Sequence, residues 1–66
     1  MNSAMNIREI DEFIAVLSNT IEMGDVSILT RAIIYYENRI PIQYINMGKN
    51  IISELLIEKI ESIQIF

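Results

Sequence analysis

The chain has 66 residues, 52% of them hydrophobic, and its nine acidic and five basic side chains give a formal net charge of −4. A chain of this size is near the lower limit for folding alone, and such domains are often held by disulfides, a structural metal or a partner. Cysteine and histidine are both absent, which excludes disulfides, thiolate zinc sites and imidazole ligands. The apolar surplus therefore predicts a core completed by oligomerisation, and a dimer is the commonest form.

The charge distribution argues against direct binding to nucleic acid. The five bases stand singly along the chain, at Arg8, Arg31, Arg39, Lys49 and Lys59. No basic stripe is therefore available to follow a phosphate backbone. The longest uncharged stretches, 13–21 and 40–48, reach only about half the length of a membrane-spanning helix. Because the N-terminus also lacks the pattern of a signal peptide, we expect a cytoplasmic protein that contacts neither nucleic acid nor membrane.

The first segment is predicted to be a helix over residues 7–23. Its aliphatic residues alternate in spacings of three and four, at Ile7, Ile10, Ile14, Leu17 and Ile21. This spacing places side chains on one narrow face of an α-helix. Asn6 and Glu9 have the spacing of a capping box, and Gly24 follows where a left-handed residue ends a helix. We expect a one-sided helix whose apolar face is satisfied inside the chain.

A second helix is predicted over residues 26–38. Asp25 can cap its start, and five apolar residues line one face, namely Val26, Leu29, Ile33, Tyr36 and Ile40. Pro41 ends it, because proline disfavours helical geometry at the residue before it. The connection to the first helix is very short, so we expect the two helices to be antiparallel neighbours.

The third segment has an apolar arc that one neighbouring helix cannot cover. The arc consists of Ile45, Ile51, Ile52, Leu55, Leu56, Ile60 and Ile63, and it is wider than the roughly 100° stripe of an ordinary surface helix. Two starts remain open: a helix over 42–64 that runs through Gly48, which we favour, or a shorter helix from Ile51 capped by Asn50.

A β-strand alternative exists at the ends of the third segment. Residues 40–45 and 62–66 alternate briefly between apolar and polar side chains. A two-stranded pair of this length would be marginal. The favoured fold is therefore all-α, a single domain over residues 1–66 in which a helical hairpin and a long C-terminal helix are completed by oligomerisation.

Apolar residues off the expected core faces mark a candidate interface. Ile28, Ala32 and Tyr35 share one flank of the second helix, while Ile34 lies on another. Lys59 falls inside the arc of the third helix, where it can snorkel, meet an acid of a partner or specify pairing register. Scattered surface hydrophobes explain the pattern without an interface, but the wide arc favours one. The candidate residues are Ile28, Ala32, Ile34, Tyr35, Ile51, Leu55, Ile57 and Lys59.

Three acids, Glu54, Glu58 and Glu61, recur on the polar side of the third helix. They could bind a cation or a basic partner, although a solvated helix face explains them as well. Serine–lysine motifs and glycine-rich phosphate loops are absent, so we expect no catalytic residue, cofactor or metal.

The expected function is a non-enzymatic protein–protein interaction module, a self-associating regulator or inhibitor that occludes a surface of a partner protein. One alternative is an acidic mimic of nucleic acid that blocks a DNA- or RNA-binding protein. Another is a minor structural subunit of a larger complex. A helix-turn-helix DNA reader is disfavoured, because none of the three helices is basic.

Overall fold

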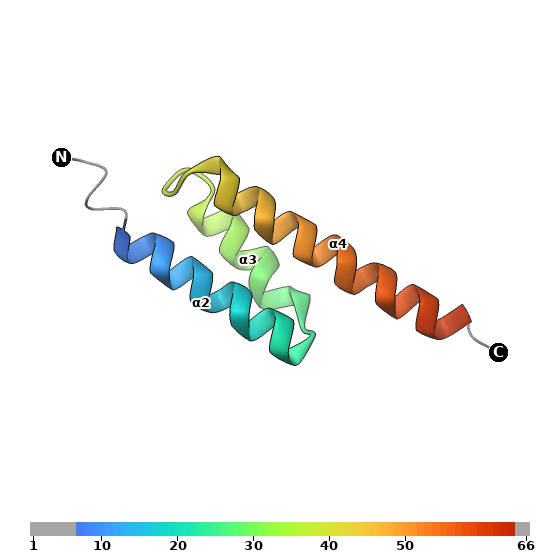
Figure 1. Ribbon diagram of the computed structural model, residues 1–66. Coiled ribbons are helices and arrows are strands. Elements are labelled where there is room, and N and C mark those ends of the chain that lie inside the picture. The colour runs from blue at the N-terminus through green and yellow to red at the C-terminus, as the bar shows by residue number, and fades with distance from the viewer. Residues whose placement is uncertain (1–6, 65–66) are drawn as a thin grey trace.

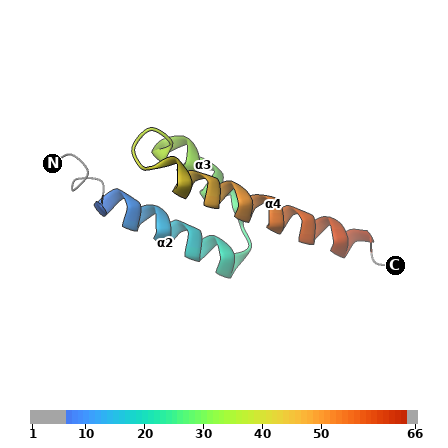
Figure 2. The same cartoon turned by 45° about the horizontal axis from the view of Figure 1, so that its top comes forward.

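The computed structural model describes residues 7–64 as three α-helices, α2 (Ile7–Met23), α3 (Val26–Tyr36) and α4 (Ile42–Gln64). Helices α2 and α3 form a hairpin, and α4 runs back along it and projects past the turn that joins them (Figures 1 and 2). The all-α prediction is confirmed. The described residues contain no strand, so the β alternative is wrong at 40–45 and at 62–64. Asn6 and residues 65–66 lie outside the described part of the chain.

The turn between α2 and α3 has the predicted caps. Gly24 has φ +75°, in the left-handed region that favours glycine, and its N–H donates to the Thr20 carbonyl at 2.7 Å. The Asp25 carboxylate accepts hydrogen bonds from the Ser27 hydroxyl at 2.7 Å and the Ser27 N–H at 3.0 Å. These bonds hold the pKa of Asp25 below its ordinary value. The side chain thus satisfies a free N–H at the start of α3.

The second connection is longer than predicted, because α3 ends at Tyr36 and not at residue 38. The N–H groups of Arg39 and Ile40 both donate to the Tyr36 carbonyl, at 2.8 and 3.2 Å. This turn brings Ile40 back into the core, where it is buried. Pro41 lies directly before α4, so the longer of the two predicted third helices is confirmed.

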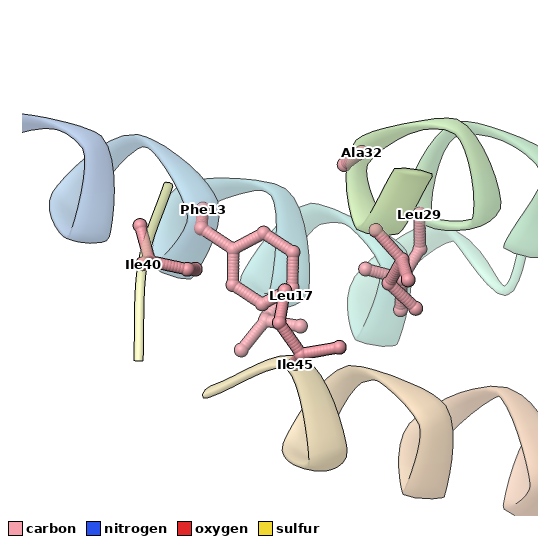
Figure 3. Close-up of a cluster of buried hydrophobic side chains, with 7 residues drawn as sticks. Phe13, Leu17, Leu29, Ala32, Ile40 and Ile45 are labelled. Carbon is pink, nitrogen blue, oxygen red and sulfur yellow. The ribbon is translucent and has the colours of Figure 1, made fainter. Parts of the chain in front are cut away.

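Each helix contributes one fully buried large side chain to the core, namely Phe13, Leu29 and Ile45. Figure 3 shows how these side chains converge. The complete cluster is Phe13, Leu17, Leu29, Ala32, Ile33, Ile40 and Ile45. All five apolar residues predicted to face the core from 26–40 are buried or half-buried.

The predicted core face of α2 is wrong in part. Leu17 is buried and Ile10 half-buried, but the remaining members of the predicted stripe, Ile7, Ile14 and Ile21, are exposed. Phe13 and Thr20 take the central positions. Because α2 packs against both α3 and α4, its buried face is turned toward Phe13, whose large ring buries more apolar surface than an isoleucine. Helix α2 is therefore left with an exposed apolar flank.

Gly48 allows α4 to approach the other two helices closely. A Cβ atom at this position would lie 3.1 Å from Cζ of Phe13 and 3.2 Å from Cδ1 of Ile33. Gly48 is buried, and Ile45 one turn earlier is buried as well. Glycine in a helix interior is unfavourable by roughly 0.5–1 kcal/mol relative to alanine. The close packing at Gly48 therefore offsets the low helix propensity of glycine.

The packing of α4 against the hairpin ends near Leu55. Up to that residue its inward side chains are buried or half-buried, whereas every residue over 56–63 is exposed. At 1.5 Å per residue, the 23-residue α4 is about 34 Å long and the 11-residue α3 about 16 Å. Residues 56–63, which we call the α4 extension, therefore reach beyond the hairpin (Figure 1).

Candidate interaction surface

The α4 extension carries four exposed large hydrophobic side chains within eight residues. Its four exposed aliphatic side chains are Leu56, Ile57, Ile60 and Ile63. Leu56, Ile60 and Ile63 are spaced i, i+4 and i+7, so they share one face of the helix. Ile52, which is half-buried, continues this stripe toward the hairpin. An apolar stripe of this kind is a candidate site of contact with another molecule.

The acidic residues of α4 lie on the other side of the helix. Glu54, Glu58 and Glu61 are all exposed, and at 100° per residue they point away from the stripe. Among the described residues, no three acidic side chains gather closely enough to hold a metal ion. A solvated helix face explains the spacing of these three acids without a ligand.

A groove of ≈ 430 Å³ lies between the end of the hairpin and the α4 extension. Its lining consists of Gly24, Leu55, Glu58, Lys59, Ser62 and Ile63. The Lys59 side chain is exposed, and its charge adds a minor contribution to the lowered pKa of Asp25. Lys59 thus lies on the hairpin side of the extension, at the edge of the apolar stripe.

The flank of α3 holds only part of the predicted interface. Ile28, Ile34 and Tyr35 are exposed, but Ala32 is 9% exposed and belongs to the core. The predicted placement of Ala32 off the core face is therefore wrong. Helix α3 packs against both α2 and α4, so the buried face of α3 is wider than one stripe. The small side chain of Ala32 is buried for this reason. Ile28 also lines a small cavity of ≈ 100 Å³ together with Val16 and Met23.

Tyr35 is held in place by two aromatic contacts within its own chain. Its ring meets that of Tyr36 edge to face, with centroids 4.7 Å apart. The Arg39 guanidinium lies 4.5 Å from the centroid of the Tyr35 ring, within the range of a cation–π contact. An exposed but ordered tyrosine loses little conformational entropy on binding, which suits it to a contact surface.

Polar contacts join the C-terminal end of α3 to α2. The Tyr36 hydroxyl donates to Oε1 of Glu12 at 2.8 Å, and this bond raises the pKa of Tyr36 to about 12. Arg39 forms an ion pair with Glu9 at 3.4 Å. Sequence reasoning missed both pairs, because their members are 24 and 30 residues apart and no local pattern connects them.

The candidate interface residues do not form one surface. Ile28, Ile34 and Tyr35 lie on α3, while Ile57 and Lys59 lie on the α4 extension. Ile51 and Leu55 are half-buried against the hairpin. Sequence reasoning also missed the exposed flank of α2, although the seven-residue spacing of Ile7, Ile14 and Ile21 could have indicated it.

Comparison of this chain with protein-family models, curated proteins and solved structures finds no match. None of the helices within residues 7–64 combines the length and the apolar character needed to cross a membrane. The function proposed below therefore rests on the exposed side chains of the described helices.

Proposed function

We propose that this chain is a non-enzymatic helical interaction module of the cytoplasm, which self-associates and acts as a regulator or inhibitor by occluding a surface of a partner protein. The observation that carries the proposal is the α4 extension, a helix whose apolar residues project past the hairpin that covers the rest of α4. Exposed apolar stripes of this kind are typical of helices that dock against other helices.

The energetics support a reversible association. Fully burying an isoleucine or leucine side chain contributes about 1.5–3 kcal/mol. The four apolar residues of the extension are each roughly half exposed, so covering them contributes on the order of 3–6 kcal/mol per chain. Two chains that cover each other thus approach the 4–15 kcal/mol or so lost in association. The surface suits a contact that forms and dissociates.

The placement of the acids favours this function over an acidic mimic of nucleic acid. A mimic needs free carboxylates along one surface. Glu9 is paired with Arg39 and Glu12 accepts a hydrogen bond from Tyr36. The acids of the third helix, Glu54, Glu58 and Glu61, span only about two helical turns, so they form a short anionic patch and not an extended track.

Sedimentation velocity at several micromolar concentrations, at low and high salt, tests the proposal. We expect a larger species that grows with concentration and persists at high salt, because apolar contacts are not screened. Binding that exists only at low salt would favour an electrostatic function such as nucleic-acid mimicry. A monomer at every concentration would contradict self-association.

A further inference from the structure

The α4 extension is held by its own backbone and not by the rest of the chain. Every residue over 56–63 is exposed, whereas α4 up to Leu55 has buried or half-buried side chains on its inner side. The ≈ 430 Å³ groove lies between this part of α4 and Gly24 of the hairpin turn. None of the side-chain hydrogen bonds or ion pairs within residues 7–64 includes a residue of the extension. Tertiary packing, which supplies most of the stability of helices in proteins, therefore contributes little over 56–63.

The charges of this segment oppose the helix as well. Glu54 and Glu58 are spaced i, i+4, and Glu58 and Glu61 are spaced i, i+3. Like charges at these spacings are neighbours on a helix and destabilise it. Lys59 relieves neither pair, because the residues three and four positions from it on either side are uncharged. Lys59 and Asp25 of the hairpin turn attract one another, but both are exposed, so solvent screens the attraction.

The end of the helix also lacks a favourable charge. The last turn of α4 contains no base but does contain Glu61. A negative charge is unfavourable there, because the C-terminal end of the helix dipole is itself negative. The extension therefore has neither tertiary packing nor local charge interactions to stabilise it.

We propose that the α4 extension unwinds and re-forms as a unit separate from the core, and that repulsion among Glu54, Glu58 and Glu61 sets how often it unwinds. The core half of α4 supplies the nucleus on which the extension re-forms. Adding one residue to an existing helix is favoured by a factor of only about 1–1.6, even for good helix formers near 0 °C. Each like-charge pair opposes the helix by a factor of about 1.4–2.3. The two repulsive pairs are therefore large enough to shift this balance.

This equilibrium controls the apolar stripe. Leu56, Ile60 and Ile63 share one face only while the segment is helical. The affinity of a partner that binds the helical form is therefore reduced by the fraction of chains in which the extension is wound. Neutralising Glu58 removes both repulsive pairs and raises that fraction. The link to binding rests on the proposed function, whereas the unwinding does not depend on it.

Amide hydrogen exchange, measured residue by residue by NMR at pH 7, tests the separate unwinding. The sample is kept at a concentration where sedimentation shows a monomer, so the outcome does not depend on self-association. Amides over 46–52 and over 59–63 both lie inside α4. We expect the second set to be protected at least tenfold less, because local opening exposes it without unfolding the core. Equal protection of the two sets would show that α4 opens as one unit and would overturn the proposal.

Glu58→Lys tests the role of the charges, because it converts both repulsive pairs into attractive ones. Lysine and glutamate have similar helix propensities. We expect protection over 59–63 to rise at least threefold and protection over 46–52 to stay unchanged. The control is Glu37→Lys, which makes the same change in net charge at an exposed position just after α3. No rise with Glu58→Lys, or an equal rise with both variants, would overturn the proposed role of the acids.

A second variant excludes a new contact between a lysine at position 58 and Asp25. Glu54→Lys combined with Glu61→Lys makes the same two pairs attractive and leaves Glu58 beside the groove. We expect protection over 59–63 to rise here too. Salt at about 1 M, where the Debye length is about 3 Å, screens the repulsion, so the wild type should gain protection and approach both variants. A difference that persists undiminished at high salt would show that repulsion is not the cause.

Discussion

Both halves of α4 carry isoleucines on one apolar arc, but these isoleucines have different environments. Ile45 in the N-terminal half is 1% exposed, whereas Ile60 in the C-terminal half is 53% exposed. Both are isoleucines on the apolar arc of one continuous helix. They differ because the hairpin of α2 and α3 covers only the first half (Figure 2). Hydrophobicity alone therefore does not determine burial here; the length of the neighbouring helices does.

Replacing an isoleucine with alanine in each half of α4 should give the largest difference in the free energy of unfolding. Ile45→Ala removes a fully buried side chain and should lower the free energy of unfolding by about 2–5 kcal/mol. Ile60→Ala should change it by less than about 0.5 kcal/mol, because the side chain is exposed and alanine favours helix. Urea unfolding followed by circular dichroism, at concentrations where the chain is monomeric, measures both. Equal effects would mean that the two halves are packed alike.

Gly48 tests whether the first half of α4 depends on close approach. Gly48→Leu places a large side chain where even a Cβ atom is crowded by Phe13 and Ile33. It should lower the free energy of unfolding by about 1–3 kcal/mol. Ser53→Leu, at an exposed position of the same helix, is the control and should be nearly neutral. If Gly48→Leu were as stable as the wild type, α4 would have to lie farther from the hairpin.

The smallest expected effect concerns the polar end of the hairpin, where the Tyr36 hydroxyl of α3 donates to Glu12 of α2. The hydrogen bond to Glu12 and partial burial raise the pKa of Tyr36 from 10.0 to about 12. Folding therefore favours the protonated hydroxyl. Its contribution to stability is fully present below pH 10 and is lost as the pH rises through 12. Because the pair is near the surface, we expect a loss of about 1 kcal/mol.

The matched control for this pH effect is Tyr36→Phe, which retains the ring against Phe13 but lacks the titrating hydroxyl. Urea unfolding of both proteins below pH 10 and near pH 12 isolates the contribution of Tyr36 from that of the other tyrosines and lysines. The stability advantage of the wild type over the variant should shrink as the pH rises. An advantage independent of pH would show that the hydrogen bond to Glu12 does not contribute.

The candidate site was only partly predictable from the sequence. The surplus of apolar residues on the third segment follows from helical periodicity, and Ile57 and Lys59 do lie on the exposed extension. Ala32 was misplaced because the pattern of one helix does not reveal how many neighbours that helix has. The exposed flank of α2 was missed for the same reason, since Ile14 and Leu17 follow the same spacing although only Leu17 is buried.

The sequence by itself determined the three helices and most of their ends, because these depend on local chemistry; the end of α3, at Tyr36 and not at residue 38, is the exception. Gly24 supplies the left-handed turn, Asp25 caps α3, and Pro41 separates α3 from α4. Only the tertiary structure decided which apolar residues are covered. That choice depends on a close approach at Gly48, on the ring of Phe13 at the centre of the core, and on a hairpin shorter than the helix it supports. These are contacts between segments far apart in the chain, and no local periodicity encodes them.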